Sequence, residues 1–331
     1  MNRRHLLVCA AGAMAPPLSA RAGEAAAPLI LIDPFTAGSN TDYFSRALAR
    51  ALGPLMGCAL LVENRAGGGG SVGAEAVARA APDGRTLGLA SVSTLVANPA
   101  LNRSLRYDPL KDFTLISTVV TVPSVAVVPA NSPIRTLDQL VRLARMRPGT
   151  LSYGSPGVGS AGHVLLEHFS HLAAARFLHV PYRGSGPMLP DVMAGRLDVV
   201  SGNTPTVLPS IRSGHLRALA VRNLTRLPQL PDTPTYQELG YSPVSAPLWF
   251  GLVGPAALPR SVAERLQQAV REAIASPAFR RQAQAAAATV TTSTPEQFQA
   301  VVRQGLARYR SVVQAVRIAH VAPGHPVESA S

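Results

Sequence analysis

The chain has 331 residues, of which 47% are hydrophobic and 15% are charged. It is long enough for two domains and apolar enough to bury a core, which excludes wholesale disorder. The formal net charge is +13, yet Lys111 is the only lysine, aromatic residues make up 5%, and no five basic residues are consecutive. The charge therefore does not indicate a nucleic-acid-binding protein, although a positive field attracts anions in general.

The first 22 residues have the pattern of a secretory signal peptide. A pair of arginines precedes the apolar stretch Leu6–Met14, and Ala20-Arg21-Ala22 has the small-x-small form of a cleavage site. We expect export with cleavage after Ala22, by either the general secretory or the twin-arginine route. No later apolar run approaches the ~18 residues that span a bilayer, so the protein is not expected to cross the membrane itself.

Short apolar runs alternate with amphipathic runs of helical length in the first part of the chain. Strands are predicted at Leu29–Ile32, Ala59–Val62, Thr86–Ala90 and Phe113–Val120. Helices are predicted at Asp42–Leu55 and Gly73–Ala80, where apolar residues recur every three or four positions. This β-α-β-α-β order predicts a parallel sheet with helices on its faces.

A second series of the same kind follows. Its predicted strands are Val125–Val128, Thr150–Tyr153, Phe177–Val180, Leu197–Val200 and Arg217–Val221, and its predicted helices are Thr136–Arg145, Gly162–Ala174 and Pro187–Ala194. A proline-rich connector then leads to a strand at Leu248–Pro255 and to helices at Ser261–Ile274 and Pro295–Ala315. Ser261 and Glu264 have the spacing of a capping box, and Pro277 indicates the end of that helix. Two α/β units therefore stand side by side.

Loops of small residues fall where the predicted strands end, which is where ligands bind in open α/β sheets. The loop Phe35–Asp42 leads into a helix N-terminus, whose free N–H groups and dipole suit an anion. Asn40 or Thr41 could cap that helix. From this loop alone, an anion site and an ordinary strand-to-helix connection are equally compatible with the sequence.

Two further loops invite other interpretations. Gly67–Gly70 lack the lysine of a phosphate loop and the later acidic residue of a dinucleotide site, so a close helix–sheet contact is favoured. Ser160 suggests a hydrolase nucleophile, but Val158 stands where that motif needs glycine and no Asp–His pair completes a triad. Arg183 either reaches a carboxylate or lies on the surface.

Histidines on one predicted helix raise the question of a metal. His168 and His171 are three residues apart, but no suitable carboxylate or cysteine completes a site beside them. We expect no metal, no cofactor and no catalytic residue.

Seven ordered segments carry a family resemblance that runs from about Pro28 to Ala315. They are PFTAGSNTD, VENRAGGGGSVGAEAVARAAPDGRTL, NPAL, RYDPLKDF, LSYGSPGVGSAGH, HVPYRGSGPMLPDVMAGRLDVV and LRALAV. Together they closely resemble the Bug family, the periplasmic solute-binding proteins of tripartite tricarboxylate transporters.

The resemblance implies a type II periplasmic-binding-protein fold, with two doubly wound α/β lobes joined by two crossover segments and a ligand cleft between them. After the signal peptide at 1–22, lobe 1 would comprise residues 23–124 and 245–331, and lobe 2 residues 125–244. The final segment would return to the first lobe.

The family's binding positions are carried over to matching residues of this chain. They are Phe35, Ala37, Gly38, Ser39, Asn40 and Asp42 in the first loop, Ser93, Ser155, Gly157, Gly159, Ser160 and His163 in and near the opposing loop, and Tyr182 and Asn203 at the cleft edge. The family grips small carboxylates mainly through main-chain N–H groups, hydroxyls and water. Two departures are visible, because Ser39 replaces a usual glycine and Gly202 a usual acidic residue. Both affect which ligand binds, and the second makes an amino acid a poorer candidate.

The expected function is that of a periplasmic solute receptor, a monomer, which binds a small organic anion (a mono- or dicarboxylate) and delivers it to membrane permease subunits. The alternatives are a sensor that presents its closed form to a signalling receptor and a serine hydrolase that uses Ser160. Neither nucleic acid nor a cofactor is expected as a partner.

Overall fold

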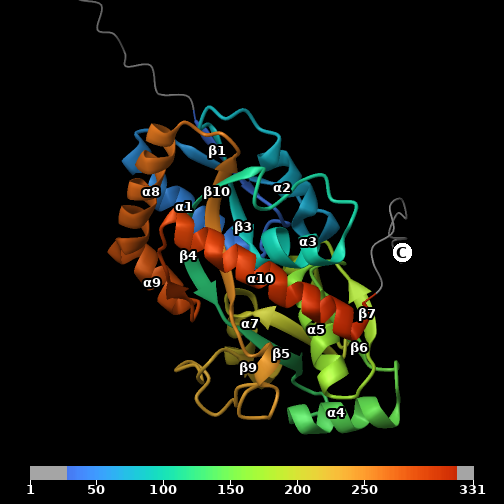
Figure 1. Ribbon diagram of the computed structural model, residues 1–331. Helices are drawn as coiled ribbons and strands as arrows, with labels where there is room; N and C mark the ends of the chain where they lie inside the picture. The colour runs from blue at the N-terminus through green and yellow to red at the C-terminus, as the bar shows by residue number, and fades with distance from the viewer. Residues whose placement is uncertain (1–27, 319–331) are drawn as a thin grey trace, which may run out of the picture.

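The computed structural model describes residues 28–318, and the expected signal peptide lies outside them. In this part of the chain, six strands form one sheet and five form another, with helices packed around both (Figure 1). None of the helices within residues 28–318 is long and apolar enough to cross a membrane.

The first sheet has the strand order β11-β4-β10-β3-β1-β2. Its strands are β1 (Leu29–Asp33), β2 (Leu60–Asn64), β3 (Thr86–Ser91), β4 (Phe113–Val122), β10 (Leu248–Pro255) and β11 (Thr289–Val290). The helices that accompany it in sequence are α1 (Asn40–Met56), α2 (Ser71–Ala78), α3 (Asn98–Leu101), α8 (Arg260–Ala275), α9 (Pro277–Ala285) and α10 (Pro295–Val316), with short helical turns at Gly68–Gly70 and Ser93–Ala97.

The second sheet has the order β7-β6-β8-β5-β9. Its strands are β5 (Ser124–Pro129), β6 (Ser152–Ser155), β7 (Leu178–Pro181), β8 (Val199–Asn203) and β9 (Leu216–Arg222). Its helices are α4 (Leu137–Met146), α5 (Ala161–Leu172), α6 (Ser185–Met193) and α7 (Thr204–Arg212), and a short turn lies at Ser242–Val244.

Each sheet is mixed, which corrects the expectation of parallel sheets. β10 runs antiparallel to β3 and β4, and β5 runs antiparallel to β8 and β9. Both reversed strands are the first that the chain forms after it crosses between the sheets. β4 ends at the edge that faces the second sheet, and Pro123 alone separates it from β5. β5 must therefore start at that edge and run away from it, and β10 does the same after the connector 223–247.

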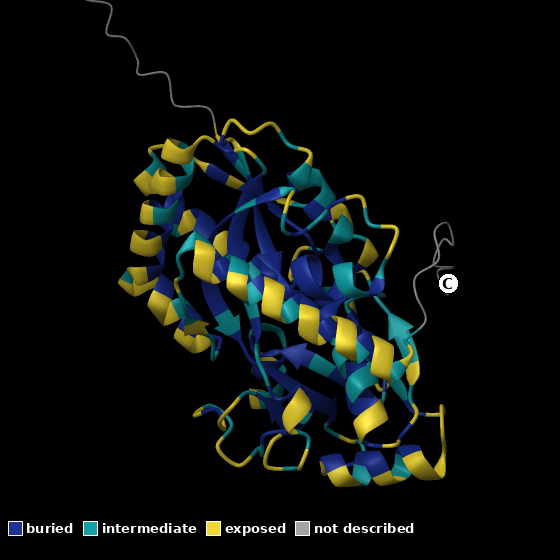
Figure 2. Cartoon of the chain, viewed as in Figure 1, coloured by how far each residue is buried: buried dark blue, intermediate teal, exposed yellow. Residues whose placement is uncertain are grey.

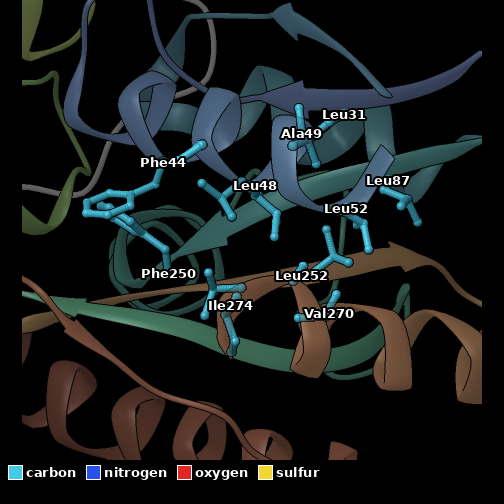
Figure 3. Packing of buried hydrophobic residues seen from close by; sticks show 14 of the residues in the cluster. Leu31, Phe44, Leu48, Ala49, Leu52, Leu87, Phe250, Leu252, Val270 and Ile274 are labelled. Atoms are coloured by element: carbon cyan, nitrogen blue, oxygen red, sulfur yellow. The ribbon is translucent and has the colours of Figure 1, made fainter. Parts of the chain in front are cut away.

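The core of the first lobe explains why α1 forms where the periodicity predicts it. Phe44, Leu48 and Leu52 recur at helical spacing, are fully buried and pack toward β10 and α8 (Figure 3). Burying a side chain of this kind contributes about 1.5–3 kcal/mol. The opposite faces of the outer helices are exposed, as the alternating colours of α8 and α10 show (Figure 2).

Two sequence predictions at helix ends were wrong or incomplete, and one helix was not predicted. α8 begins at Arg260 after Pro259, so Ser261 is not its cap, and the capping box is found instead at Thr294 and Gln297 of α10. Pro277 does not only end a helix, because it occupies the first turn of α9, where proline is well tolerated. α7 was not predicted, because Pro205 and Pro209 conceal its helical pattern.

α10 lies diagonally across both lobes (Figure 1). It contacts β4 and α3 of the first lobe and α5 of the second. A buried apolar cluster joins them, with Tyr309 and Val313 of α10 packed with Val96 and with Val164 of α5. This helix therefore ties the two lobes together on one side.

Candidate ligand-binding site

The first loop is held by a buried acid at the end of β1. The carboxylate of Asp33 accepts hydrogen bonds from the Phe35 amide (2.9 Å) and from the hydroxyls of Thr41 (3.0 Å) and Ser45 (2.7 Å). Burial raises the pKa of Asp33 to about 7, although these hydrogen bonds oppose the shift. Asp33 thereby ties the loop after β1 to the first turns of α1.

The N-terminus of α1 is capped by Ser39, whose hydroxyl accepts from the Asp42 amide at 3.2 Å. The carboxylate of Asp42 is occupied by protein donors, namely the Gly38 amide, Asn64 Nδ2 and Arg46 Nε, each at 3.0 Å. Those hydrogen bonds, Arg46 foremost, hold the pKa of Asp42 below its usual range, against the effect of burial. Asp42 therefore shapes the loop from its outer side.

The second loop is built in the same way around α5. Ser160 caps this helix by accepting from the His163 amide at 3.3 Å. Ser155 Oγ lies 2.6 Å from His179 Nε2, and the ring of His163 stacks on that of His179 with centroids 4.3 Å apart. Burial lowers the pKa of His163 to about 4 and of His179 to about 3, so both rings are neutral near pH 7. The hydroxyl of Ser160 thus serves as a helix cap, which leaves no structural support for its use as a nucleophile.

The glycine-rich loops of the two lobes contact each other. A Cβ atom at Gly69 would lie 2.6 Å from Val158 O and 2.8 Å from Ser160 N, and one at Gly159 would lie 2.1 Å from the Asn98 side chain. Gly73 allows the helix–sheet contact predicted for this segment, since a Cβ there would lie 2.7 Å from Pro34 Cα. Gly69 and Gly159 therefore allow the two lobes to approach each other closely.

A small, partly enclosed cavity of about 30 Å³ lies between the sheets, with room for about two water molecules. Three hydrogen bonds cross between the lobes beside it. They run from Ser185 Oγ to Asn40 Oδ1 (3.1 Å), from the Asn40 amide to Ser185 Oγ (3.5 Å) and from the Ala161 amide to Ser93 Oγ (3.0 Å). The lining contains no acidic side chain; it consists of Phe35, Asn40, Thr41, Ser91, Ser93, Leu248 and Phe250 from the first lobe and Pro156, Gly162, Ser185, Ser201, Asn203 and Arg222 from the second.

Two buried donors of this lining lack partners. Asn203 is 8% exposed and its Nδ2 has no acceptor, and Arg222 is 4% exposed and its Nη1 has none. Such groups are costly to bury unless something binds them. The cavity is therefore ready to accept a ligand that brings hydrogen-bond acceptors.

The residues expected from the sequence fall into three groups. Those that line the cavity are Phe35, Asn40, Ser93 and Asn203. Those that line an outer groove of about 500 Å³ between α1 and α6–α7 are Gly38, Ser39 and Asp42. Those that line neither are Ala37, Ser155, Gly157, Gly159, Ser160, His163 and Tyr182. Tyr182 donates to Asp191 Oδ2 at 2.5 Å. A role in ligand binding stays a prediction for the residues of all three groups.

Sequence reasoning missed Arg222. Arg183, the arginine that it considered for a carboxylate, is exposed, whereas Arg222 is buried at the cavity. The available signal was its position at the end of β9, since ligands bind where the strands of such sheets end.

Two lobes that close over a polar cavity define a solute-binding protein of the periplasmic type. The family model of the tripartite tricarboxylate transporter family receptor matches residues 44–318. The chain belongs to this family, whose members bind solutes and are not enzymes. The resemblance seen in the sequence is thereby confirmed.

Individual relatives agree with this assignment. Protein BugT of Bordetella pertussis is 36% identical over 95% of this chain and 98% of its own length. Among solved structures, Rpa4515 of R. palustris with adipate is 30% identical with a TM-score of 0.84, covering 88% of this chain and 98% of that one. MatC of Rhodopseudomonas palustris with bound malate is 27% identical with a TM-score of 0.83, covering 87% and 99%. The expected two-lobed binding-protein fold is confirmed, while the lobe boundaries near residues 124 and 244 stay a prediction.

Proposed function

We propose that this protein is a periplasmic receptor that binds a small carboxylate and delivers it to a tripartite membrane permease. The observation that carries the proposal is the cavity between the lobes. Its lining, drawn from residues 28–318, offers hydroxyl, amide and guanidinium donors and no acidic side chain. The proposal is further supported by relatives solved with adipate and malate, both of which are dicarboxylates.

Two helix N-termini supply the main-chain part of the attraction. Asn40 and Thr41 of α1 and Gly162 of α5 line the cavity from opposite lobes. First-turn N–H groups have no acceptor within their own helix, and the helix dipole favours a negative charge beside them. Ser39 and Ser160 occupy one such amide in each helix, those of Asp42 and His163. The Asn40 amide donates to Ser185 Oγ and the Ala161 amide to Ser93 Oγ. The amides of Thr41 and Gly162 remain to bind a carboxylate.

Closure follows from the same geometry. A ligand that contacts both lobes binds the closed form better than the open one and shifts the population toward closure. Because the cavity holds only about 30 Å³, the ligand enters while the lobes are apart and the lining adjusts around it. The closed form then carries a surface that a permease can distinguish from the open one.

A thermal-shift panel of mono- and dicarboxylates on the exported protein tests the proposal. At a thousandfold excess over Kd, the correct ligand should stabilise the folded state by about 4 kcal/mol, and calorimetry should give one site per chain. Amino acids and neutral amides of matched size are the controls. If no carboxylate shifts the unfolding midpoint while a neutral or cationic solute does, the proposal fails.

Delivery to a permease needs a separate test. Membranes that contain the permease subunits should retain the ligand-bound protein, and cells that lack the protein should lose uptake of the labelled ligand. Retention by a receptor kinase or other signalling receptor, with normal uptake, would favour the sensor function instead.

A further inference from the structure

Arg222 has a buried charge with no counter-ion among residues 28–318. Its Nε donates to Ser124 Oγ at 2.7 Å, whereas its Nη1 has no partner. Among the ion pairs of the part of the chain that the structure describes, none includes Arg222. A buried guanidinium is normally paired with a carboxylate, because its desolvation is costly.

The groups that act electrostatically on Arg222 do not supply that carboxylate. They are Tyr236, Tyr309 and Arg308. Burial raises the pKa of both tyrosines, so they are neutral, and Arg308 adds a second positive charge nearby. The guanidinium keeps its proton in proteins. The described residues therefore supply no anion to pair with the Arg222 guanidinium, and a bound ligand could supply one.

The guanidinium is held by its own sheet. Arg222 ends β9 directly opposite Ser124, which begins β5, and the Nε–Oγ bond fixes the side chain across this strand pair. Arg222 lines the cavity together with Asn203, which pairs with the same Ser124 from the other side of β5. This arrangement positions the charge independently of the first lobe.

We propose that Arg222 determines specificity by binding one carboxylate of a small dicarboxylate, while the other carboxylate lies at the N-termini of α1 and α5. The inference rests on the proposed function and deepens it by naming the ligand class. Two separate positive features support a dianion, because Arg222 carries a full charge and each helix N-terminus about half an elementary charge. An ammonium group placed near Arg222 would be repelled, which disfavours amino acids.

The test measures dicarboxylates against their monoamides by calorimetry. Succinate, glutarate and adipate are each compared with the ω-monoamide of the same length, which replaces one carboxylate by a neutral isostere. The proteins are the wild type, Arg222→Met, Arg222→Lys and the control Arg212→Met, which removes an exposed charge from the same lobe. The wild type should bind the best dicarboxylate about tenfold to a hundredfold more tightly than its monoamide, the range for one hydrogen-bonded charge.

Arg222→Met should abolish that preference, Arg222→Lys should retain part of it, and Arg212→Met should leave it unchanged. The ligand-free Arg222→Met protein should also melt at a higher temperature than the wild type, because a buried charge without a partner has been removed. An equal loss of affinity for both ligand forms, or a fall in the melting temperature of the ligand-free variant, would assign Arg222 a structural role and overturn the inference. If carboxylates bind the wild type but the preference survives in Arg222→Met, only the role of Arg222 fails. If none of these acids binds the wild type, the proposed function fails as well.

Discussion

Among single residues, Asp33 links the ligand site to pH. It bonds to Thr41, which lines the cavity, and its pKa of about 7 lets it exchange a proton near neutrality. An anionic ligand disfavours the charged form of Asp33 and so raises its pKa further. Binding should therefore take up protons, and carboxylate affinity should rise as the pH falls from 8 to 6, by at most about tenfold per pH unit.

Calorimetry in buffers of different ionisation enthalpy measures this proton uptake. Asp33→Asn should remove it, and His163 and His179 do not interfere, because both stay neutral in this range. The same shift has a consequence for stability, since Asp33 has a higher pKa folded than unfolded. The contribution of this pKa difference to the free energy of unfolding is full below about pH 4 and is lost as the pH rises through about 7. An affinity that is flat or falls between pH 8 and 6 would contradict the prediction.

Residues also show the limit of sequence reasoning. Phe35, Asn40, Ser93 and Asn203 were expected at the site and line the cavity, because strand ends and helix starts are visible as patterns. Arg222 was not expected, because one buried arginine among many cannot be distinguished in sequence from those on the surface. Its burial follows from the pairing of β9 with β5, a contact between distant segments.

At the scale of elements, the cap of α1 should matter more for binding than for folding. Ser39 and Thr136 both cap a helix by accepting from the amide three residues on, each at 3.2 Å. Ser39→Ala and Thr136→Ala should each lower the free energy of unfolding by about 1 kcal/mol. Only Ser39→Ala should also weaken carboxylate binding, because α1 presents its first turn to the cavity and α4 does not. Denaturant unfolding and calorimetry on both variants separate the two effects, and equal loss of affinity would contradict this role of α1.

Elements with strong periodicity were predicted to within a few residues, and the exceptions have physical causes. α1 and β10 show clear apolar patterns, and β10 matches the prediction at both ends. α7 and α9 begin with prolines in their first turns, which sequence reasoning treats as breaks. The reversal of β5 and β10 depends on where the chain crosses between sheets, which a local pattern does not contain.

At the scale of the whole molecule, closure depends on the contact between the glycine loops. Gly69 has φ +61° and no room for a Cβ, whereas Gly57 has φ +72° with nothing within 4 Å of that position. Gly69→Ala and Gly57→Ala should both lose about 1 kcal/mol of stability to backbone strain. Only Gly69→Ala should also prevent full closure, because its Cβ would collide with Val158 O.

Small-angle scattering should show this difference. Saturating ligand should compact the wild type and Gly57→Ala, while Gly69→Ala should stay extended and bind more weakly. Full compaction of Gly69→Ala with unchanged affinity would show that the two loops need not meet.

Both crossovers lead to the cavity. Leu248, the first residue after the second crossover, lines it, and Ser124, the first residue after the other, holds Arg222, which lines it too. Residues at the crossovers, about which the lobes would rotate, thus also contribute to the ligand site. A small change in the angle between the lobes at the crossovers moves the outer edges of the lobes by a larger distance. A solute that fits poorly would leave the outer edges of the lobes apart. A partner that binds only the closed form would then reject this complex without contacting the solute.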